Sequence, residues 1–155
     1  MGTRVIDIIG AEPISIAEAK QWLRVYHNND NSLIEDVIIP AVRSYFERHL
    51  DISLIEKRVR FTVQGAEENI RLPLWPVDEI ETITPDTLTQ EDGVLNNSKG
   101  ENIDVTYTTD KYVKPEIKTG MLSLLSHWYI NRDMSSVPDS VEKIIKSNTR
   151  ILWFV

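Results

Sequence analysis

The side chains best suited to catalysis or metal binding are scattered along this chain. His27, His49 and His127 lie far apart, and none has a partner at the spacing of a metal site. Adjacent carboxylates occur at 35–36, 67–68 and 78–79, and such pairs arise without purpose in an acidic chain. No segment matches a nucleophile elbow, a P-loop or a glycine-rich dinucleotide turn. We therefore expect no enzyme, no metal and no cofactor.

Length and composition indicate one ordinary globular domain over residues 1–155. The 155 residues are 41% hydrophobic and 26% charged, which is enough to bury a core. No apolar run approaches the roughly 18 residues of a membrane helix, and no signal peptide is evident. The chain has no cysteine, which excludes disulfides and thiolate metal sites. We expect an intracellular protein, or part of an assembly built inside a cell, with no membrane contact.

The negative charge is concentrated in the middle of the chain. Residues 64–104 hold ten acidic and two basic residues, whereas the remainder holds 14 acidic and 15 basic residues. An acidic surface repels phosphate, so sequence-specific DNA binding is not expected. The simplest interpretation is a solvated, acidic loop and sheet face.

The helix expected over residues 114–133 is the centre of the predicted core. Pro115 suits its first turn, and Glu116 meets the positive end of the helix dipole. An apolar stripe follows at helical spacing, made of Ile117, Met121, Leu124, Leu125 and Trp128. Gly120 costs on the order of 1 kcal/mol against alanine unless something packs closely on it.

Two helices are predicted before it. Ser15 and Glu18 form a capping box that starts the first, and residues 1–12 before it are an extended arm that either pairs as a strand or lies on a neighbour. The second is long, over 33–50, with Pro40 inside its apolar pattern. A kink at Pro40 is favoured, with two helices meeting there as the alternative.

Strands are predicted between the long helix and the central one. Residues 58–63 alternate polar and apolar, and shorter alternating segments lie at 70–74, 80–84 and 103–107. Residues 85–101 are a hairpin or a long mobile loop. A short helix over 139–148 precedes an apolar ending, ILWFV, which either folds back on its own core or fills a partner's groove.

Four segments in this order resemble the head–tail connector family of tailed phages and prophages, also called adaptor or head-completion proteins. They are PISIAEAK at 13–20 with LRV at 23–25; the helix from Leu33 through Ala41 with Arg43 and Glu47; LP at 72–73 with WPV at 75–77; and a block of VTYT at 105–108, PEIK at 115–118, HWYINR at 127–132 and VP at 137–138. The family often has glycine where 110–112 is DKY, a Thr-Gly pair where 51–52 is DI, and a more polar ending.

The resemblance implies a mainly helical α+β fold with a small antiparallel sheet or hairpins. This helical connector-type domain would have an N-terminal arm over 1–12, a long second helix, the central helix over 114–133 and an apolar tail over 149–155. Its subunits would form a homo-oligomeric ring, usually twelve-fold, below the portal protein in the virion neck. The ring would extend the DNA channel, let DNA pass without specific binding, and offer a docking surface to the next neck or tail protein.

Two sets of residues would carry this role. The acidic channel-facing set is Glu67, Glu68, Asp86, Glu91, Asp92 and Glu101. The portal-binding set is Ile151, Leu152, Trp153, Phe154 and Val155, with Trp153 and Phe154 as anchors. One alternative is a nucleic-acid-binding packaging accessory that uses Arg43 and Arg48 on its helices. Another is a small enzyme with an acidic site within 78–104.

Overall fold

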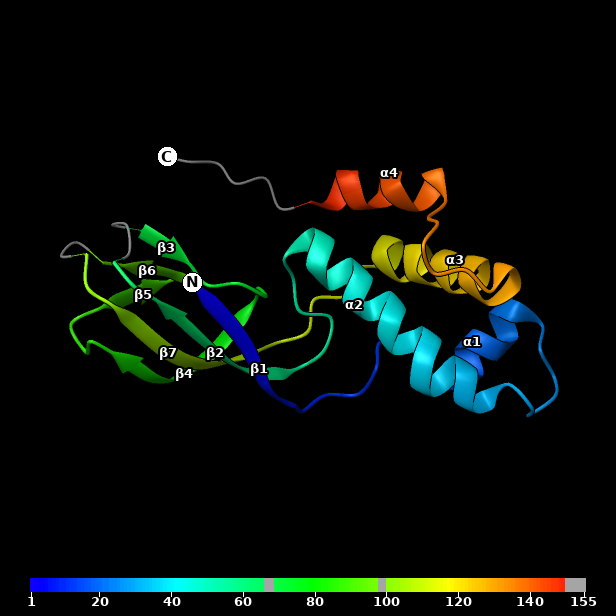
Figure 1. Ribbon diagram of the computed structural model, residues 1–155, viewed down its shortest axis with the longest axis horizontal. Helices are drawn as coiled ribbons and strands as arrows, with labels where there is room; N and C mark the ends of the chain where they lie inside the picture. Colours follow the sequence, from blue (N-terminus) through cyan, green and yellow to red (C-terminus); the bar gives the residue numbers. More distant parts are fainter. Residues whose placement is uncertain (66–68, 98–99, 150–155) are drawn as a thin grey trace. The chain divides into compact units, whose positions relative to one another are not determined.

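The computed structural model describes residues 1–65, 69–97 and 100–149 (Figure 1). The chain divides into two compact units. The β unit comprises Met1–Ala11 and Ile52–Tyr112, and the helical unit comprises Glu12–Asp51 and Val113–Val155. Most of the β unit is therefore inserted into the sequence of the helical unit.

The expected mainly helical, connector-type fold is wrong. Of the described residues, 38% are helical and 28% are in strands, so the protein is a mixed α+β fold with two antiparallel sheets. Two of the alternatives left open are confirmed, because the N-terminal arm pairs as a strand and residues 85–101 contain a hairpin of two short strands. The error lies in the strand content, which these segments raise above that of a mainly helical fold. Short polar strands carry little alternation in hydrophobicity, so their sequences do not separate them from loops.

The helical unit contains α1 (Ile16–Leu23), a π-helical turn η1 (Leu33–Ile38), α2 (Ile39–Leu50), α3 (Pro115–Asn131) and α4 (Asp139–Asn148). The predicted capping box opens α1: Ser15 Oγ accepts from the Glu18 N–H at 3.2 Å, and Glu18 Oε2 accepts from the Ser15 N–H at 3.0 Å. These bonds satisfy backbone donors that have no partner within the helix.

The helical path continues past Pro40, with a change of helix type just before it. The π-helical turn ends at Ile38, and Pro40 lies in the first turn of α2. A proline there does not break a helix, because the N–H that it lacks belongs to the first turn. The structure thus combines the two sequence-based alternatives, with successive helical segments of different type that join without a loop.

The core of the helical unit is built around α3, as predicted. All five residues of its apolar stripe are buried. Gly120 is buried with them, and a Cβ atom at this position would lie 3.0 Å from Cζ of Phe46 and 3.2 Å from Cγ2 of Ile144. A side chain at this position would therefore require the Phe46 ring on α2 and Ile144 on α4 to shift by a few tenths of an ångström.

An ion pair links α1 to α3 and gives a pH-dependent prediction. Lys118 Nζ lies 2.6 Å from Glu18 Oε1, and this bond, helped by those from Ser15, lowers the pKa of Glu18 from 4.5 to about 2. Glu18 then stabilises the fold above pH 4.5, and this contribution is lost as the pH falls toward 2. Because the Glu18 side chain is 45% exposed, solvent screening keeps the contribution small.

We expect Lys118→Met to raise the pKa of Glu18 toward its ordinary value, because the largest cause of the shift is removed. A carboxyl ¹³C NMR titration of the full chain measures this directly. Lys143→Met, which removes an exposed lysine of α4, is the matched control and should leave Glu18 unchanged. A Glu18 pKa still near 2 in Lys118→Met would contradict the assignment.

The β unit contains two antiparallel sheets. The larger has the order β1 (Gly2–Ile8), β2 (Lys57–Val63), β7 (Ile103–Thr109), β4 (Val77–Thr84). The smaller has the order β3 (Asn69–Arg71), β6 (Val94–Asn96), β5 (Thr89–Glu91). The N-terminal arm thus forms the edge strand β1, with Val5 opposite Val59 of β2.

One apolar core joins the strands of the β unit. Its buried members are Val59, Phe61, Val63, Ile70, Leu72, Leu95, Ile103, Val105 and Tyr107. They come from β2 and β7 of the larger sheet, from β3 and β6 of the smaller one, and from the segment after β3. The edge strand β1 contributes no member, and its seven residues are all exposed. Within the described residues, no helix is long and apolar enough to cross a membrane.

Candidate assembly surfaces

The predicted portal-binding residues Ile151, Leu152, Trp153, Phe154 and Val155 lie outside the described residues, as do Glu67 and Glu68. The structure places the other acidic candidates in the β unit. Asp86 lies in the loop after β4, Glu91 ends β5, and Asp92 lies in the turn between β5 and β6. All three are exposed.

Glu101 differs from the other acidic candidates. It is only half exposed, and its backbone is held by Asn97: the Glu101 N–H donates to Asn97 Oδ1 at 3.1 Å, and its carbonyl accepts from Asn97 Nδ2 at 2.9 Å. The Glu101 backbone is therefore anchored to Asn97, whereas Asp86, Glu91 and Asp92 are exposed.

The charge follows the division into units. The β unit has 13 acidic and seven basic residues, a net charge of −6, whereas the helical unit has 11 acidic and ten basic residues. Within the larger sheet the charge is also uneven. Strand β2 carries Lys57, Arg58 and Arg60, whereas β4 carries Asp78, Glu79 and Glu81. The sheet is thus basic toward β1 and acidic toward β4.

Cross-strand ion pairs link the basic and acidic parts of this sheet. Arg58 Nε donates to Glu81 Oε2 at 2.7 Å, and Arg60 Nε donates to Asp104 Oδ1 at 2.9 Å. The bonds to Arg60 lower the pKa of Asp104, and the same contact raises the pKa of Arg60. Within the described residues, the exposed charges of Arg4 on β1 and Glu79 on β4 have no such partner.

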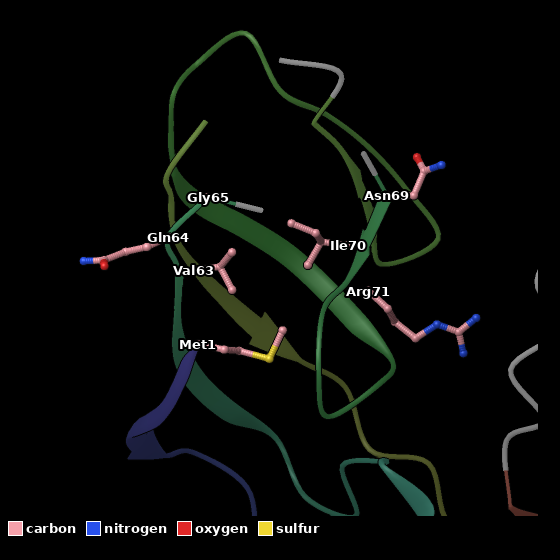
Figure 2. A pocket seen from close by; sticks show the side chains of 7 residues that line it. All are labelled: Met1, Val63, Gln64, Gly65, Asn69, Ile70 and Arg71. Atoms are coloured by element: carbon pink, nitrogen blue, oxygen red, sulfur yellow. The ribbon is translucent and has the colours of Figure 1, made fainter. Parts of the chain in front are cut away.

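A pocket of about 460 Å³ lies in the β unit beside β3 (Figure 2). Met1, Val63 and Ile70 give it apolar walls, and Arg71 lies at its border. The Arg71 Nη1 atom is buried and has no hydrogen-bond partner among the described residues.

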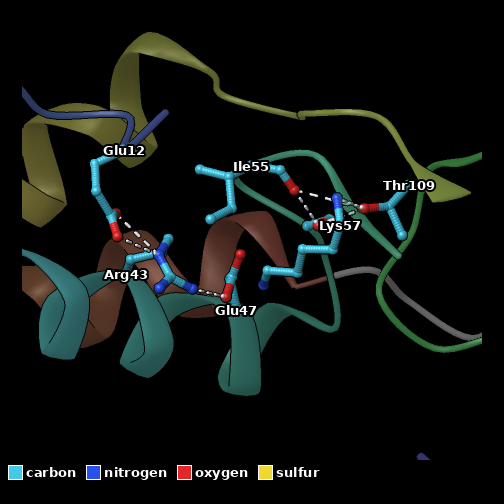
Figure 3. Close-up of polar contacts among 7 residues, drawn as sticks. Glu12, Arg43, Glu47, Ile55, Lys57 and Thr109 are labelled. Atoms are coloured by element: carbon cyan, nitrogen blue, oxygen red, sulfur yellow. Dashed lines mark hydrogen bonds and ion pairs between the residues drawn. The ribbon is translucent and has the colours of Figure 1, made fainter. Parts of the chain in front are cut away.

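A buried ion-pair cluster lies in the helical unit (Figure 3). Arg43 Nε donates to both carboxylate oxygens of Glu12 at 2.9 and 3.0 Å, and Arg43 Nη1 donates to Glu47 Oε2 at 2.9 Å. Arg43 is 7% exposed and Glu47 is 5% exposed. Arg43 was considered as a nucleic-acid contact, but it is buried and paired, so its charge is not available to a phosphate.

A second polar cluster, also drawn in Figure 3, closes the two ends of the inserted segment within the β unit. Thr109 Oγ1 donates to Ser53 Oγ at 2.8 Å and accepts from the Lys57 N–H at 3.1 Å. The Tyr112 N–H also donates to the Ser53 carbonyl at 2.9 Å. These bonds hold the first and last residues of the segment together.

Two of the three histidines contact neighbours in their own helix or in the turn that follows it. His49 Nδ1 contacts the Tyr45 carbonyl, and His127 contacts Ser136 and Asn131. In the part of the chain that the structure describes, no group of three metal-binding side chains occurs. Trp128 is buried, as expected of a core residue, whereas Trp22 is 47% exposed, because α1 turns Leu23 further inward.

Exposed apolar side chains are the feature that sequence reasoning did not assign. They gather on β1 and just after it, at Val5, Ile6, Ile8 and Ile9, which are 42–56% exposed. Ile130 at the end of α3 is another. The signal on the arm was the run of four apolar residues interrupted only by Asp7, which is unusual for a terminal segment.

No protein-family model matches this chain, and no curated protein matches it by sequence. Solved structures do match its fold. A chain in the neck of an empty gene transfer agent particle, computed with C6 symmetry, aligns with a TM-score of 0.76 at 13% identity over 99% of this chain and 98% of that chain. A chain of the native particle's virion aligns at 0.74 and 13% identity, and one of its neck computed with C12 symmetry at 0.68 and 12%, with the same coverage.

Proposed function

We propose that this chain is a structural, non-catalytic protein of the neck of a tailed-phage-like particle. Its specific role is that of the adaptor that lies below the portal. One observation carries the proposal: the whole fold, β unit included, matches a chain from a gene transfer agent neck with a TM-score of 0.76. The alignment covers 99% of this chain, so it includes the inserted β unit as well as the helices. A match that includes this insertion is more specific than a match of a common helical bundle alone.

A ring is the proposed assembly. The matching neck structures were computed with C6 and C12 symmetry. A cyclic ring uses head-to-tail interfaces in which two different surfaces of one subunit meet. Each of twelve copies of this chain would therefore need two complementary sides for its neighbours in the ring. It would also need one face for the portal and another for the next neck or tail protein.

The acidic surface of the β unit gives the ring a way to let DNA pass. Carboxylates repel the phosphate backbone, so an acidic channel wall does not retain the moving duplex. In this proposal Asp86, Glu91, Asp92 and Glu101, with Glu67 and Glu68, face the channel. A net charge of −6 in the β unit supports the assignment, because the repulsion adds over many copies.

Sedimentation of the purified protein, alone and mixed with the portal ring of the same genome, tests the proposal. We expect the protein to move with the portal at one copy for each portal subunit, because matched symmetry requires it. Absence of binding by well-folded protein at tens of micromolar would overturn the adaptor role. Salt-dependent DNA binding in the same assay would instead favour a packaging accessory.

The tail supplies a sharper prediction. We propose that Ile151 to Val155 bind the portal, with Trp153 and Phe154 as anchors. Each tail binds weakly, but a ring presents many tails to a symmetric partner and gains through effective concentration. We expect Trp153→Ala/Phe154→Ala to weaken portal attachment by at least about tenfold, because aromatic anchors dominate interfaces of this kind.

The control for this prediction is Ile151→Ala, which reduces the apolar surface area of the tail and keeps both aromatic anchors. It should weaken attachment much less than the double variant. Portal binding should be measured by titration at fixed salt, with circular dichroism to confirm that each variant is folded. Unchanged attachment of a chain that lacks all five residues would exclude the tail as the portal contact.

A further inference from the structure

The edge strand β1 is unlike a protected sheet edge. Among the described residues it pairs on one side only, with β2, and its seven residues are exposed. Three of those residues are Val5, Ile6 and Ile8, which are 42, 46 and 52% exposed. Free backbone groups beside apolar side chains form a template for another strand, and soluble proteins usually block such edges.

The register shows that this apolar surface continues the core face of the sheet. Side chains of directly opposite residues point to the same face, and Val5 lies opposite the buried Val59, as Thr3 lies opposite the buried Phe61. Past the register shift at Ile6, Ile8 lies opposite the buried Lys57. The core face of the sheet thus extends from β2 onto β1. The residues that bury β2 in the apolar core leave β1 exposed.

The opposite edge of the same sheet has complementary charge. Strand β4 carries Asp78, Glu79 and Glu81 and no basic residue, whereas β1 and β2 together carry four basic residues and Asp7. Arg4 on β1 lies directly opposite Arg60, whose guanidinium is already bonded to Asp104, so an external carboxylate is left to meet Arg4. The exposed Arg4 of β1 and the three carboxylates of β4 favour head-to-tail association over the pairing of like edges.

The strand directions allow a second copy to continue the sheet. Each neighbouring pair in the order β1-β2-β7-β4 is antiparallel, so β4 runs opposite to β1. A second copy in the same orientation, placed with its β1 beside β4 of the first, therefore continues the antiparallel alternation. Such a contact joins two different surfaces, which is what a cyclic ring requires.

We propose that neighbouring subunits are joined by pairing of β1 from one copy with β4 of the next, so that the ring contains a continuous antiparallel sheet. The partner is a second copy of this chain, selected by Arg4 and the apolar side chains of β1 meeting the acidic edge strand β4. This inference rests on the proposed ring function and names the surfaces that close the ring. It also assigns a role to the apolar N-terminal arm.

Irregularities on both edges restrict the pairing to the correct partner. The register of β1 shifts between Val5 and Asp7, and that of β4 shifts on both sides of Ile80. A bulged strand twists and bends locally, so it pairs poorly with an arbitrary flat strand. These irregularities therefore favour a partner strand that has a matching bend.

Disulfide cross-linking tests the contact directly, because the chain has no cysteine of its own. One cysteine is introduced on β1, at Arg4, Val5 or Ile6, and one on β4, at Asp78, Glu79 or Ile80. All nine pairings are oxidised on the portal-bound protein and on concentrated free protein. Cross-strand neighbours lie within reach of a disulfide, whose Cβ atoms are about 3.5–4.5 Å apart.

We expect at least one pairing to give a ladder of covalent oligomers on a denaturing gel, extending beyond the dimer. Each single-cysteine variant should remain monomeric, because it carries only one half of the contact. Dimers from a β1 cysteine alone would show like-edge pairing and overturn the proposal. If portal-bound protein gives no ladder in any pairing, the edge contact is overturned and the adaptor role stays intact. If the protein fails to bind the portal, the result counts against the adaptor role itself.

Charge reversal provides an independent readout on the same samples. We expect Arg4→Glu to raise the concentration for half-assembly by about tenfold or more, and Glu79→Arg to do the same. The combined variant Arg4→Glu/Glu79→Arg should recover much of the loss, because positions 4 and 79 again carry opposite charges. Lys111→Glu, which makes the same change at an exposed loop position, should have no effect. Absence of recovery together with an effect of Lys111→Glu would reduce the result to net charge and contradict the edge contact.

Discussion

Arg43→Ala is expected to lower the free energy of unfolding of the helical unit by about 3–5 kcal/mol, the usual cost of breaking a buried ion pair from one side. Arg43 bonds to Glu12 and Glu47 at 2.9 Å, and the Glu47 carboxylate is 6% exposed. Removing the guanidinium withdraws its hydrogen bonds from both carboxylates and leaves a cavity. This loss is a large part of the roughly 5–15 kcal/mol that stabilises a typical domain.

Urea unfolding followed by far-ultraviolet circular dichroism measures this effect, because the helices dominate the signal. Arg48→Ala, at an exposed position of the same helix, is the matched control and should change stability by no more than about 0.5 kcal/mol. Arg43→Met separates charge from packing, since it keeps most of the aliphatic stem. Wild-type stability in Arg43→Met would show that the ion pairs contribute nothing and would contradict the prediction.

Phe46→Ala is expected to have a similar cost, about 3–5 kcal/mol, for a different reason. Phe46 is fully buried, and its ring lies against the position where Gly120 leaves room on α3. Truncation removes the transfer free energy of a phenyl group and opens a cavity at the centre of the helical core. The same urea experiment measures it, and a cost below about 1.5 kcal/mol would show that the site collapses around the missing ring.

Gly120→Ala in combination with Phe46→Leu shows whether the two positions share one space. In the wild-type background, alanine gains up to about 1 kcal/mol of helix propensity but places Cβ against the Phe46 ring. Phe46→Leu replaces that ring with a smaller side chain, so Gly120→Ala should be more favourable in the Phe46→Leu background than in the wild type. Additive effects of the two substitutions would contradict direct contact.

The helices and their core were predictable because their signals are periodic. The capping box at Ser15, the apolar stripe of α3 and the short helix α4 are all found where the sequence places them. The second sheet was predicted only in pieces, as an alternating segment at 70–74 and as one of two alternatives for 85–101, because β3, β5 and β6 have three residues each. A strand that short cannot display a period of two, and only its pairing partner defines it.

The candidate surfaces were predictable in part. The acidic stretch is visible in composition, and Asp86, Glu91 and Asp92 are exposed as expected. The position of the acidic strand β4 at a sheet edge was not predictable, because it depends on strand order. Strand β4 lies beyond β7, so residues 77–84 reach an edge that their position in the sequence does not indicate. The burial of Arg43, which one alternative interpretation uses as a nucleic-acid contact, was also not predictable. It depends on tertiary contacts, which bring Glu12 to Arg43.

The bond between Ser53 and Tyr112 has a consequence for the order in which the chain folds. Helices α2 and α3 are separated by more than sixty residues, and loop closure over that length costs conformational entropy before their contacts form. Pairing of Lys57 with Thr109 within the β unit brings the two ends of the intervening segment together and shortens the effective loop to a few residues. We therefore expect the inserted β unit to fold first and to bring the ends of α2 and α3 within reach of each other. The helical unit is then completed last, although its first two helices leave the ribosome earlier.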